Sequence, residues 1–140
     1  RETLPEAQKH EGASIKHDVA VPIARFAEFV SEASAAVRKK RADVRVVAFG
    51  HLGDGNVHFN LTQPTNMERP EFLAEWRDFN RIVHDIAVSM GGSFSAEHGV
   101  GLLRLKQMKQ YKNPAGLSVM AKIKKALDPH GILNPGKVIP

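Results

Sequence analysis

The densest group of side chains able to bind a metal or move a proton lies in residues 50–60, GHLGDGNVHFN. His51 ends one predicted strand and His58 lies in the next, and the short glycine-rich connection lets both imidazoles face one point. A period of two along the second strand places His58 and Asn60 on the same face, away from its apolar side. The spacing therefore predicts a polar site on one face of a sheet.

A second cluster lies in residues 91–101, GGSFSAEHGVG, where Glu97 and His98 follow an extended segment. The glycines on both sides permit an irregular backbone and the close approach of a ligand. Two histidines and one carboxylate suit a divalent metal such as zinc and leave coordination positions open for a substrate. The chain has no cysteine, so any metal here must be bound by nitrogen and oxygen. The predicted metal ligands are His51, His58 and Glu97.

Both clusters also have a purely structural interpretation. Asp54-Gly55 is typical of a hairpin turn, which needs a positive φ and no ligand. The glycines around Glu97 would suit a strand-to-helix loop with a carboxylate near the helix N-terminus. This interpretation explains either histidine of the hairpin taken alone. It is weaker for two histidines that bracket one turn beside Asn60, and it leaves His98 unexplained.

The periodicity of the chain predicts the elements that would position these clusters. Strands are expected at residues 14–20, 44–49 and 57–62, with a short extended piece at residues 93–96. Helices are expected at residues 22–37, 70–90, 100–111 and 115–127, before a closing loop at residues 128–140. The order β-α-β-β-α-β predicts an α+β fold, with a ferredoxin-like, mainly antiparallel sheet, helices on one face and a helical C-terminal tail.

Length and composition predict a single globular domain over residues 1–140. Of these residues 42% are hydrophobic and 25% are charged, a balance that can bury a core. No apolar run is long enough to span a bilayer, and we expect a cytoplasmic domain or one peripheral to a membrane. The chain begins with Arg1 rather than Met, and its opening residues are typical of the middle of a longer polypeptide. We therefore expect a further domain upstream.

The chain is basic, with a net charge of +5 and a pI near 9.7. Such a charge could attract nucleic acid, an anionic membrane surface or small acidic substrates. The excess is concentrated in residues 38–41 and 104–125. The first of these runs would also stabilise a helix C-terminus by opposing the helix dipole. Charge alone does not choose among these partners.

Three segments, GHLGDGNVHFN, SAEHGVG and DPHGILNPGKVIP, together resemble the C-terminal domain of FAD-linked oxidases. Their order and separation match across nearly the whole chain. That family includes D-lactate dehydrogenase, D-2-hydroxyglutarate dehydrogenase and the D subunit of glycolate oxidase. The resemblance implies that the chain is the substrate- and metal-binding cap domain of a flavin-dependent dehydrogenase, whose N-terminal FAD-binding domain lies outside this chain.

The resemblance also implies roles for individual residues. His98 would be the general base and Asn60 would contact the substrate. The three predicted metal ligands keep that role, with zinc as the expected metal. The substrate carboxylate would be held by Arg1 and Lys16. The flavin would be approached by Asn134 and Lys137, in the closing segment ILNPGK.

The implied reaction oxidises a D-2-hydroxy acid of the D-lactate, glycolate or D-2-hydroxyglutarate type to the 2-oxo acid, with hydride transfer to FAD. Metal binding would lower the pKa of the substrate hydroxyl. His98, with an ordinary pKa of about 6.5, is suited to accept the proton. The expected electron acceptor is a quinone, a cytochrome or an electron-transfer flavoprotein. The fragment alone is expected to be inactive.

Two other functions compete with this one. The chain could be a noncatalytic metal-binding or assembly domain, if the longer protein lacked a working flavin site. A basic nucleic-acid-binding module is the weaker alternative, because such sheets present aromatic side chains for base stacking. The chain has seven Phe, one Trp and one Tyr. Phe72, Trp76 and Phe79 are expected on the core face of a helix, so no nucleic-acid partner is expected.

Overall fold

The structure is a computed structural model that describes residues 3–140, and the chain forms two compact units that divide between Glu97 and His98. The first unit contains α1 (Leu4–His10), β1 (Ser14–Ala20), the 3₁₀ turn η1 (Ile23–Arg25), α2 (Phe26–Lys40), β2 (Arg45–His51), the 3₁₀ turn η2 (Leu52–Asp54), β3 (Asn56–Thr62), α3 (Arg69–Ala74) and α4 (Trp76–Ser89). The second unit contains α5 (Leu105–Tyr111) and α6 (Pro114–Leu127). Among the described residues, no helix has the length and apolar character needed to cross a membrane.

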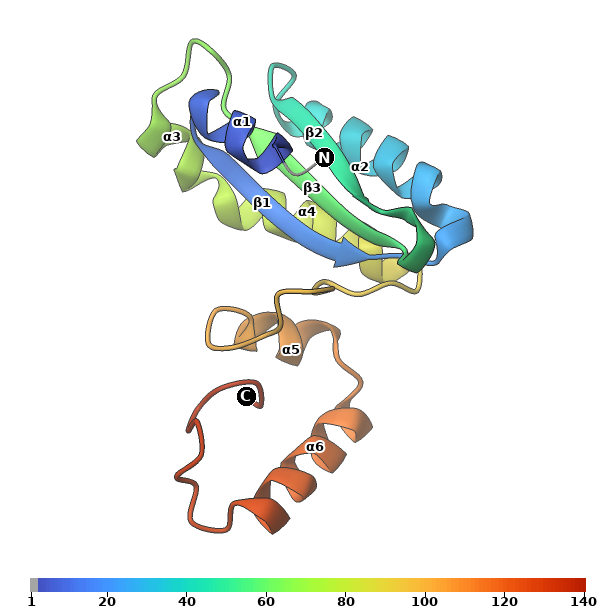
Figure 1. The fold of residues 1–140 in the computed structure, drawn as a ribbon, viewed down its shortest axis with the longest axis vertical. Helices are drawn as coiled ribbons and strands as arrows, with labels where there is room; N and C mark the ends of the chain where they lie inside the picture. Colours follow the sequence, from blue (N-terminus) through green and yellow to red (C-terminus); the bar gives the residue numbers. More distant parts are fainter. Residues whose placement is uncertain (1–2) are drawn as a thin grey trace. The chain divides into compact units, whose positions relative to one another are not determined.

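The sheet has three strands in the order β1-β3-β2, and β3 pairs antiparallel with both neighbours. β1 and β2 are therefore parallel to each other, and α2 connects them while β3 lies between (Figure 1). This is the split β-α-β arrangement of ferredoxin-like folds. The predicted α+β class and antiparallel sheet are confirmed.

The hydrophobic core lies between the sheet and the two long helices, α2 and α4. Along β3 the side chains of Val57, Phe59 and Leu61 are completely buried on this face, as the period of two predicts. Phe29 of α2 packs against Phe59, with ring centroids 5.8 Å apart. Each fully buried side chain of this size contributes about 1.5–3 kcal/mol to folding. The core fixes the opposite face of β3 as the polar one.

Helix α1, which the sequence pattern did not predict, contacts the polar face of the sheet. Gln8 is buried there: its Oε1 accepts a hydrogen bond from Asn60 Nδ2 at 2.8 Å. Its Nε2 donates to Thr62 Oγ1 at 3.5 Å. A helix of seven residues is too short to be stable alone, so these contacts stabilise it. Helices thus touch both faces, although the two long helices share one.

β2 extends two residues beyond its predicted end, because its pairing with β3 continues past Phe49. Gly50 makes this possible, since a Cβ at that position would lie 2.1 Å from the carbonyl oxygen of Asn56. His51 therefore remains in the ladder, opposite Asn56, instead of lying in a flexible turn.

The extended piece at residues 93–96 does not form the predicted fourth strand. Ser93 makes an isolated antiparallel bridge with Ala20 of β1, with N–H···O distances of 2.8 and 3.0 Å. Beyond it, Ser93 Oγ donates to the carbonyl of Ser95 at 2.8 Å and accepts from the Ser95 amide at 3.2 Å. Local bonds of this kind compete with a strand ladder. In place of the fourth strand of a ferredoxin-like sheet, this segment therefore contributes only the bridge between Ser93 and Ala20.

Three helix predictions need correction. Residues 70–90 form two helices that separate at Glu75, whose carboxylate accepts hydrogen bonds from Arg41. The helix expected from residue 100 begins at Leu105, because Gly99 and Gly101 have left-handed φ values of 70° and 52°. Trp76 was expected in the core but is 41% exposed.

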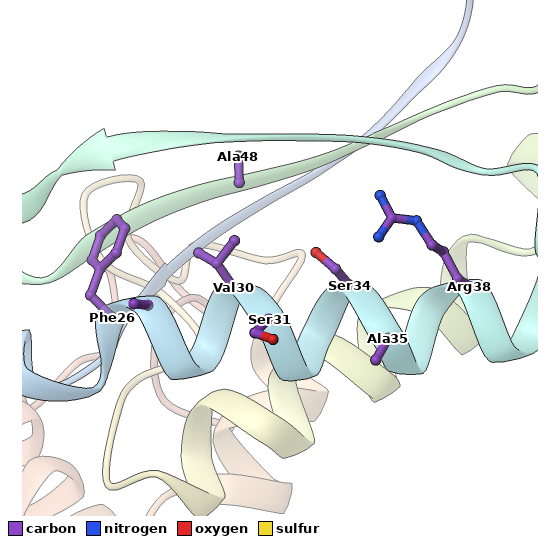
Figure 2. Close-up of a pocket in the computed structure, with 8 residues that line it drawn as sticks. Phe26, Val30, Ser31, Ser34, Ala35, Arg38 and Ala48 are labelled. Atoms are coloured by element: carbon purple, nitrogen blue, oxygen red, sulfur yellow. The ribbon is translucent and has the colours of Figure 1, made fainter.

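A groove of about 690 Å³ lies on the helix side of the sheet, beside α2 and Ala48 of β2. Figure 2 shows Phe26, Val30 and Arg38 along α2 on one side of it, with Ala48 facing them. No histidine or carboxylate lines it. The groove is therefore separate from the two polar clusters, because His58 lies on the opposite face of the sheet.

Candidate metal and proton-transfer site

Two adjacent strands position the hairpin histidines. His58 of β3 pairs with Phe49 of β2, and the two rings lie 5.2 Å apart between centroids. His51 follows Phe49 by two residues and therefore points to the same face of the sheet. The two imidazole centroids are 6.2 Å apart. The connection is ordered by Asp54, whose carboxylate accepts a hydrogen bond from the Asn56 amide at 3.2 Å.

Glu97 completes the cluster from the far end of the first unit. Its Oε1 lies 3.1 Å from His51 Nε2, and its Oε2 lies 3.7 Å from His58 Nε2. One donor atom from each of the three residues lies within 4.8 Å of the others. The structure thus brings together the three side chains that were predicted as a set.

The geometry of the cluster fits a divalent metal. Nitrogen and oxygen ligands at zinc lie at about 2.0–2.2 Å, which places tetrahedral donor atoms roughly 3.3 Å from one another. The distances of 3.1 and 3.7 Å from Glu97 to the histidines bracket that separation. His51, His58 and Glu97 have side chains that are 33%, 17% and 44% exposed, so the cluster is open on one side. Three protein ligands and an open side are typical of catalytic zinc sites.

Asp18 of β1 is a buried part of this site that the sequence analysis missed. Its carboxylate accepts hydrogen bonds from the amide of Glu97 at 2.9 Å and the amide of Ala96 at 3.2 Å. It also accepts from Asn56 Nδ2 at 3.3 Å and lies 3.9 Å from His58 Nδ1. Asp18 therefore holds the main chain that carries Glu97. The strand register could have identified Asp18, because antiparallel pairing of β1 and β3 places Asp18 opposite His58.

The predicted substrate residues have different environments. Lys16 is exposed on β1 and pairs with Asn60, on the polar face of the sheet. Asn60 is buried, and its amide is held by Gln8. Arg1 lies outside the described residues. His98 is exposed and begins the second unit, joined to Glu97 by one peptide bond.

The two predicted flavin contacts lie together in the second unit. Lys137 Nζ donates a hydrogen bond to Asn134 Oδ1 at 3.2 Å, and Asn134 has a left-handed φ of 45°. Both residues line a mostly apolar cavity of about 460 Å³ between α6 and the closing loop. The structure thus places them beside one cavity, and their role toward a cofactor stays a prediction.

The amino-acid sequence of the chain is similar to one described family and to several named proteins. Residues 1–138 match the family described as FAD linked oxidases, C-terminal domain. The chain is 36% identical to D-2-hydroxyglutarate dehydrogenase of Stutzerimonas stutzeri, over 99% of the chain and 30% of that protein. It is 35% identical to mitochondrial D-2-hydroxyglutarate dehydrogenase of Arabidopsis thaliana, over 100% of the chain and 24% of the relative. It is 37% identical to D-lactate dehydrogenase of Anaerostipes hadrus, over 86% of the chain and 25% of that protein. The chain spans less than a third of the length of these relatives.

Proposed function

The chain belongs to the family of FAD-linked oxidases, C-terminal domain, and from that premise we propose that it is the substrate- and metal-binding part of a flavin-dependent D-2-hydroxy-acid dehydrogenase. The longer protein would oxidise a D-2-hydroxy acid to the 2-oxo acid, with FAD bound by an N-terminal domain. The relatives named D-2-hydroxyglutarate dehydrogenase and D-lactate dehydrogenase support this reaction class.

The observation that carries the proposal is the convergence of His51, His58 and Glu97. These residues come from two strands and a loop 39 positions beyond the second histidine, yet one donor atom of each lies within 4.8 Å of the others. A buried carboxylate, Asp18, holds the amide of Glu97 at 2.9 Å. A hairpin that needed only turn chemistry would not require either the carboxylate or its buried support.

We propose that His51, His58 and Glu97 hold a divalent metal, with zinc as the expected ion. When bound, the metal would supply Lewis acidity that lowers the pKa of the substrate's α-hydroxyl. The chain's own residues would fix the substrate beside it. Lys16 supplies a cation on the polar face of the sheet, and Asn60 supplies an amide that Gln8 keeps in one orientation.

His98 is the proposed general base. Its Cα lies about 3.8 Å from that of Glu97, because one trans peptide bond joins them. An imidazole side chain is suited to act as a general base near neutral pH, here by accepting the proton of the substrate hydroxyl. In the longer protein we propose that Asn134 and Lys137 approach the flavin, and that a quinone, a cytochrome or an electron-transfer flavoprotein accepts its electrons in the cytoplasm or at a membrane periphery.

The first test is metal binding by this chain. Zn²⁺ is titrated calorimetrically into the wild type and into His58→Ala and Glu97→Gln. We expect one-to-one binding by the wild type and a loss of about tenfold or more in affinity in each variant, because each removes one of three ligands. His130→Ala, which removes an exposed histidine of the second unit, is the matched control and should bind like the wild type.

The result has two clear alternatives. Equal binding by the wild type and both ligand variants would show that the proposed ligand set is wrong. A second outcome would favour the noncatalytic metal-binding function. In that outcome Zn²⁺ binding depends on His58 and Glu97, but the flavin-containing longer protein reduces no electron acceptor with any D-2-hydroxy acid.

A further inference from the structure

The two ring nitrogens of His58 face different groups. Its Nε2 lies 3.7 Å from Oε2 of Glu97, the carboxylate that His51 also meets. Its Nδ1 lies 3.9 Å from Oδ1 of Asp18, the residue opposite it in the ladder of β1 and β3. A ring nitrogen that carries a proton has no lone pair to donate to a metal. The neutral ring of His58 can therefore bind a metal through Nε2 only if its proton is on Nδ1.

The two carboxylate oxygens of Asp18 have separate partners. Oδ2 accepts hydrogen bonds from the amides of Ala96 and Glu97, at 3.2 and 2.9 Å. Oδ1 accepts from Nδ2 of Asn56 at 3.3 Å, and it is the oxygen that faces His58. An ionised carboxylate accepts hydrogen bonds and donates none, so these donors suit a negatively charged Asp18. At 3.9 Å the negative charge favours a proton on Nδ1 by electrostatic attraction, because the distance is too long for a hydrogen bond.

Asn56 is placed to keep Oδ1 of Asp18 in this position. It is 3% exposed and lies two residues before His58 on β3, so both side chains are on the polar face of the sheet. The Oδ1 atom of Asn56 is inaccessible to solvent and has no hydrogen-bond partner among the described residues. A buried polar atom without a partner is destabilising, so such atoms are rare in folded proteins. An apolar side chain would avoid that cost, and the amide is therefore better explained by the hydrogen bond that it donates to Asp18.

The main chain of Asn56 is fixed independently of its side chain. It pairs with Ala20 on one side and with His51 on the other, in the middle strand of the sheet. Its amide also donates a hydrogen bond to the carboxylate of Asp54 at 3.2 Å. A substitution of the Asn56 side chain should therefore leave the hairpin in place, so that its contact with Asp18 can be tested separately.

We propose that Asn56 and Asp18 are positioning residues for His58. Asn56 holds Oδ1 of Asp18 beside Nδ1 of the ring, and the carboxylate keeps the ring proton there, so that Nε2 is left to bind the metal. Histidines that bind metals commonly direct their other ring nitrogen to a carboxylate. The inference rests on the proposed metal site and assigns Asn56 a role in it. One carboxylate then positions two of the three proposed ligands, Glu97 through Oδ2 and His58 through Oδ1.

The position of the ring proton is measured first, in the metal-free chain. Long-range ¹H–¹⁵N NMR correlation at about pH 8.5, where histidine side chains are ordinarily neutral, distinguishes a proton on Nδ1 from one on Nε2. His58→Ala identifies the signals of this ring. We expect mainly the Nδ1–H form in the wild type and a shift toward the Nε2–H form in Asn56→Ala. A wild-type ring protonated mainly at Nε2 would overturn the inference, even if Asn56→Ala does not fold.

The matched control is Asn80→Ala. It removes another buried amide of the first unit, on α4, and should leave the ring of His58 as in the wild type. A shift toward the Nε2–H form in Asn80→Ala equal to that in Asn56→Ala would show that the ring responds to a general loss of stability, and the specific role of Asn56 would be overturned.

Titration with Zn²⁺ then relates the ring proton to metal binding. Asn56→Ala should bind Zn²⁺ about tenfold more weakly than the wild type, because residues that orient metal ligands typically contribute roughly 10- to 100-fold to affinity. An unchanged ring form in Asn56→Ala, or a Zn²⁺ affinity within about twofold of the wild type, would overturn the role of Asn56. A chain that binds no Zn²⁺, but whose ring form depends on Asn56, would instead overturn the proposed metal site and leave the orientation of His58 in place.

Discussion

The two units of the chain are stabilised by different kinds of interaction. In the first unit, large apolar side chains from the sheet and from α2 and α4 form one buried cluster, in which Phe29, Phe59 and Phe79 have no exposed area. Within residues 98–140, Met108 is the buried apolar side chain, and α6 buries none. Leu103 and Leu127 are 86% and 77% exposed. The first unit therefore carries its own core, whereas the second presents apolar surface typical of a segment that packs on another part of a larger protein.

Polar contacts take the place of a core in the second unit. The Asp128 carboxylate accepts a hydrogen bond from Lys124 and from the amides of Ile132 and Leu133, both at 3.0 Å. Lys124 also donates to the carbonyl of Leu133 at 2.5 Å. Asn113 caps α6 by accepting from the amide of Ala115 at 2.8 Å. The closing loop is thus attached to α6 mainly through one lysine and one carboxylate.

The largest expected effect comes from opening the core of the first unit. Phe59→Ala removes a completely buried ring that packs against Phe29, and should lower the free energy of unfolding by about 3–5 kcal/mol. Urea unfolding followed by the fluorescence of Trp76, the single tryptophan, measures it in the first unit. Leu103→Ala, in the second unit, is the control and should leave this transition unchanged. A loss below about 1 kcal/mol in Phe59→Ala would contradict the single core described for the first unit.

A smaller effect is expected from the buried carboxylate that supports the metal cluster. Asp18→Asn replaces an acceptor of several hydrogen bonds with an amide, and should cost about 1–3 kcal/mol in stability because amide donors are left unsatisfied. Zn²⁺ affinity should also fall by about tenfold, since the main chain of Glu97 loses its anchor. Calorimetry and urea unfolding measure the two effects. Asp85→Asn, on the surface of α4, is the control, and unchanged Zn²⁺ binding in Asp18→Asn would show that Glu97 is positioned without Asp18.

The first unit could be predicted well where local pattern and burial agree. β1 has its predicted bounds, and the buried face of β3 follows from the alternation of Val57, Phe59 and Leu61. The set of His51, His58 and Glu97 was predictable because two histidines of one hairpin must lie close together. The carboxylate was found by its chemistry and by resemblance, since spacing does not fix a residue 39 positions away.

Other features depend on tertiary contacts that the sequence does not display. His17 is buried in the core, where its Nδ1 donates to the carbonyl of Phe59 at 2.7 Å and its ring meets that of His84 edge-on. Nothing local separates these core histidines from the pair in the hairpin. Helix α1 forms because Gln8 finds partners on β3, and the role of Asp18 appears only once the register is known. Contacts between residues far apart in the sequence, rather than local secondary-structure propensity, determine the burial of His17, the formation of α1 and the role of Asp18.

The third prediction concerns the polar attachment of the closing loop. The hydrogen bond from Lys124, together with the amides of Leu133 and Ile132, lowers the pKa of Asp128 to about 2, below its ordinary value of 3.8. A lowered pKa in the folded state gives stabilisation that is present above about pH 4 and is lost as the pH falls toward 2. The amide shifts of residues 132 and 133 should therefore change with a midpoint near pH 2, and Asp128→Asn should abolish that change at every pH. A midpoint near 3.8 would show that the carboxylate is not held. Trp76 fluorescence in Asp128→Asn at neutral pH should match the wild type, because the first unit keeps its own core.

The smallest effect on the stability of this chain is expected at the exposed apolar surface of α6. A substitution there tests whether the second unit, unlike the first, depends on packing against another domain. Leu127→Ser changes a side chain that is 77% exposed, so the unfolding free energy of this chain should change by no more than about 0.5 kcal/mol. If that surface packs on the FAD-binding domain in the longer protein, the same substitution should there weaken flavin retention or lower the melting temperature, because a buried leucine contributes about 1.5–3 kcal/mol. Comparing Leu127→Ser in this chain and in the longer protein separates the contact of Leu127 with the FAD-binding domain from the intrinsic stability of α6.

Two outcomes would contradict this prediction. Equal, negligible effects in both proteins would show that Leu127 faces solvent in each, and the apolar surface would then have no role in domain packing. A large loss in this chain alone would mean that the second unit has a core of its own after all.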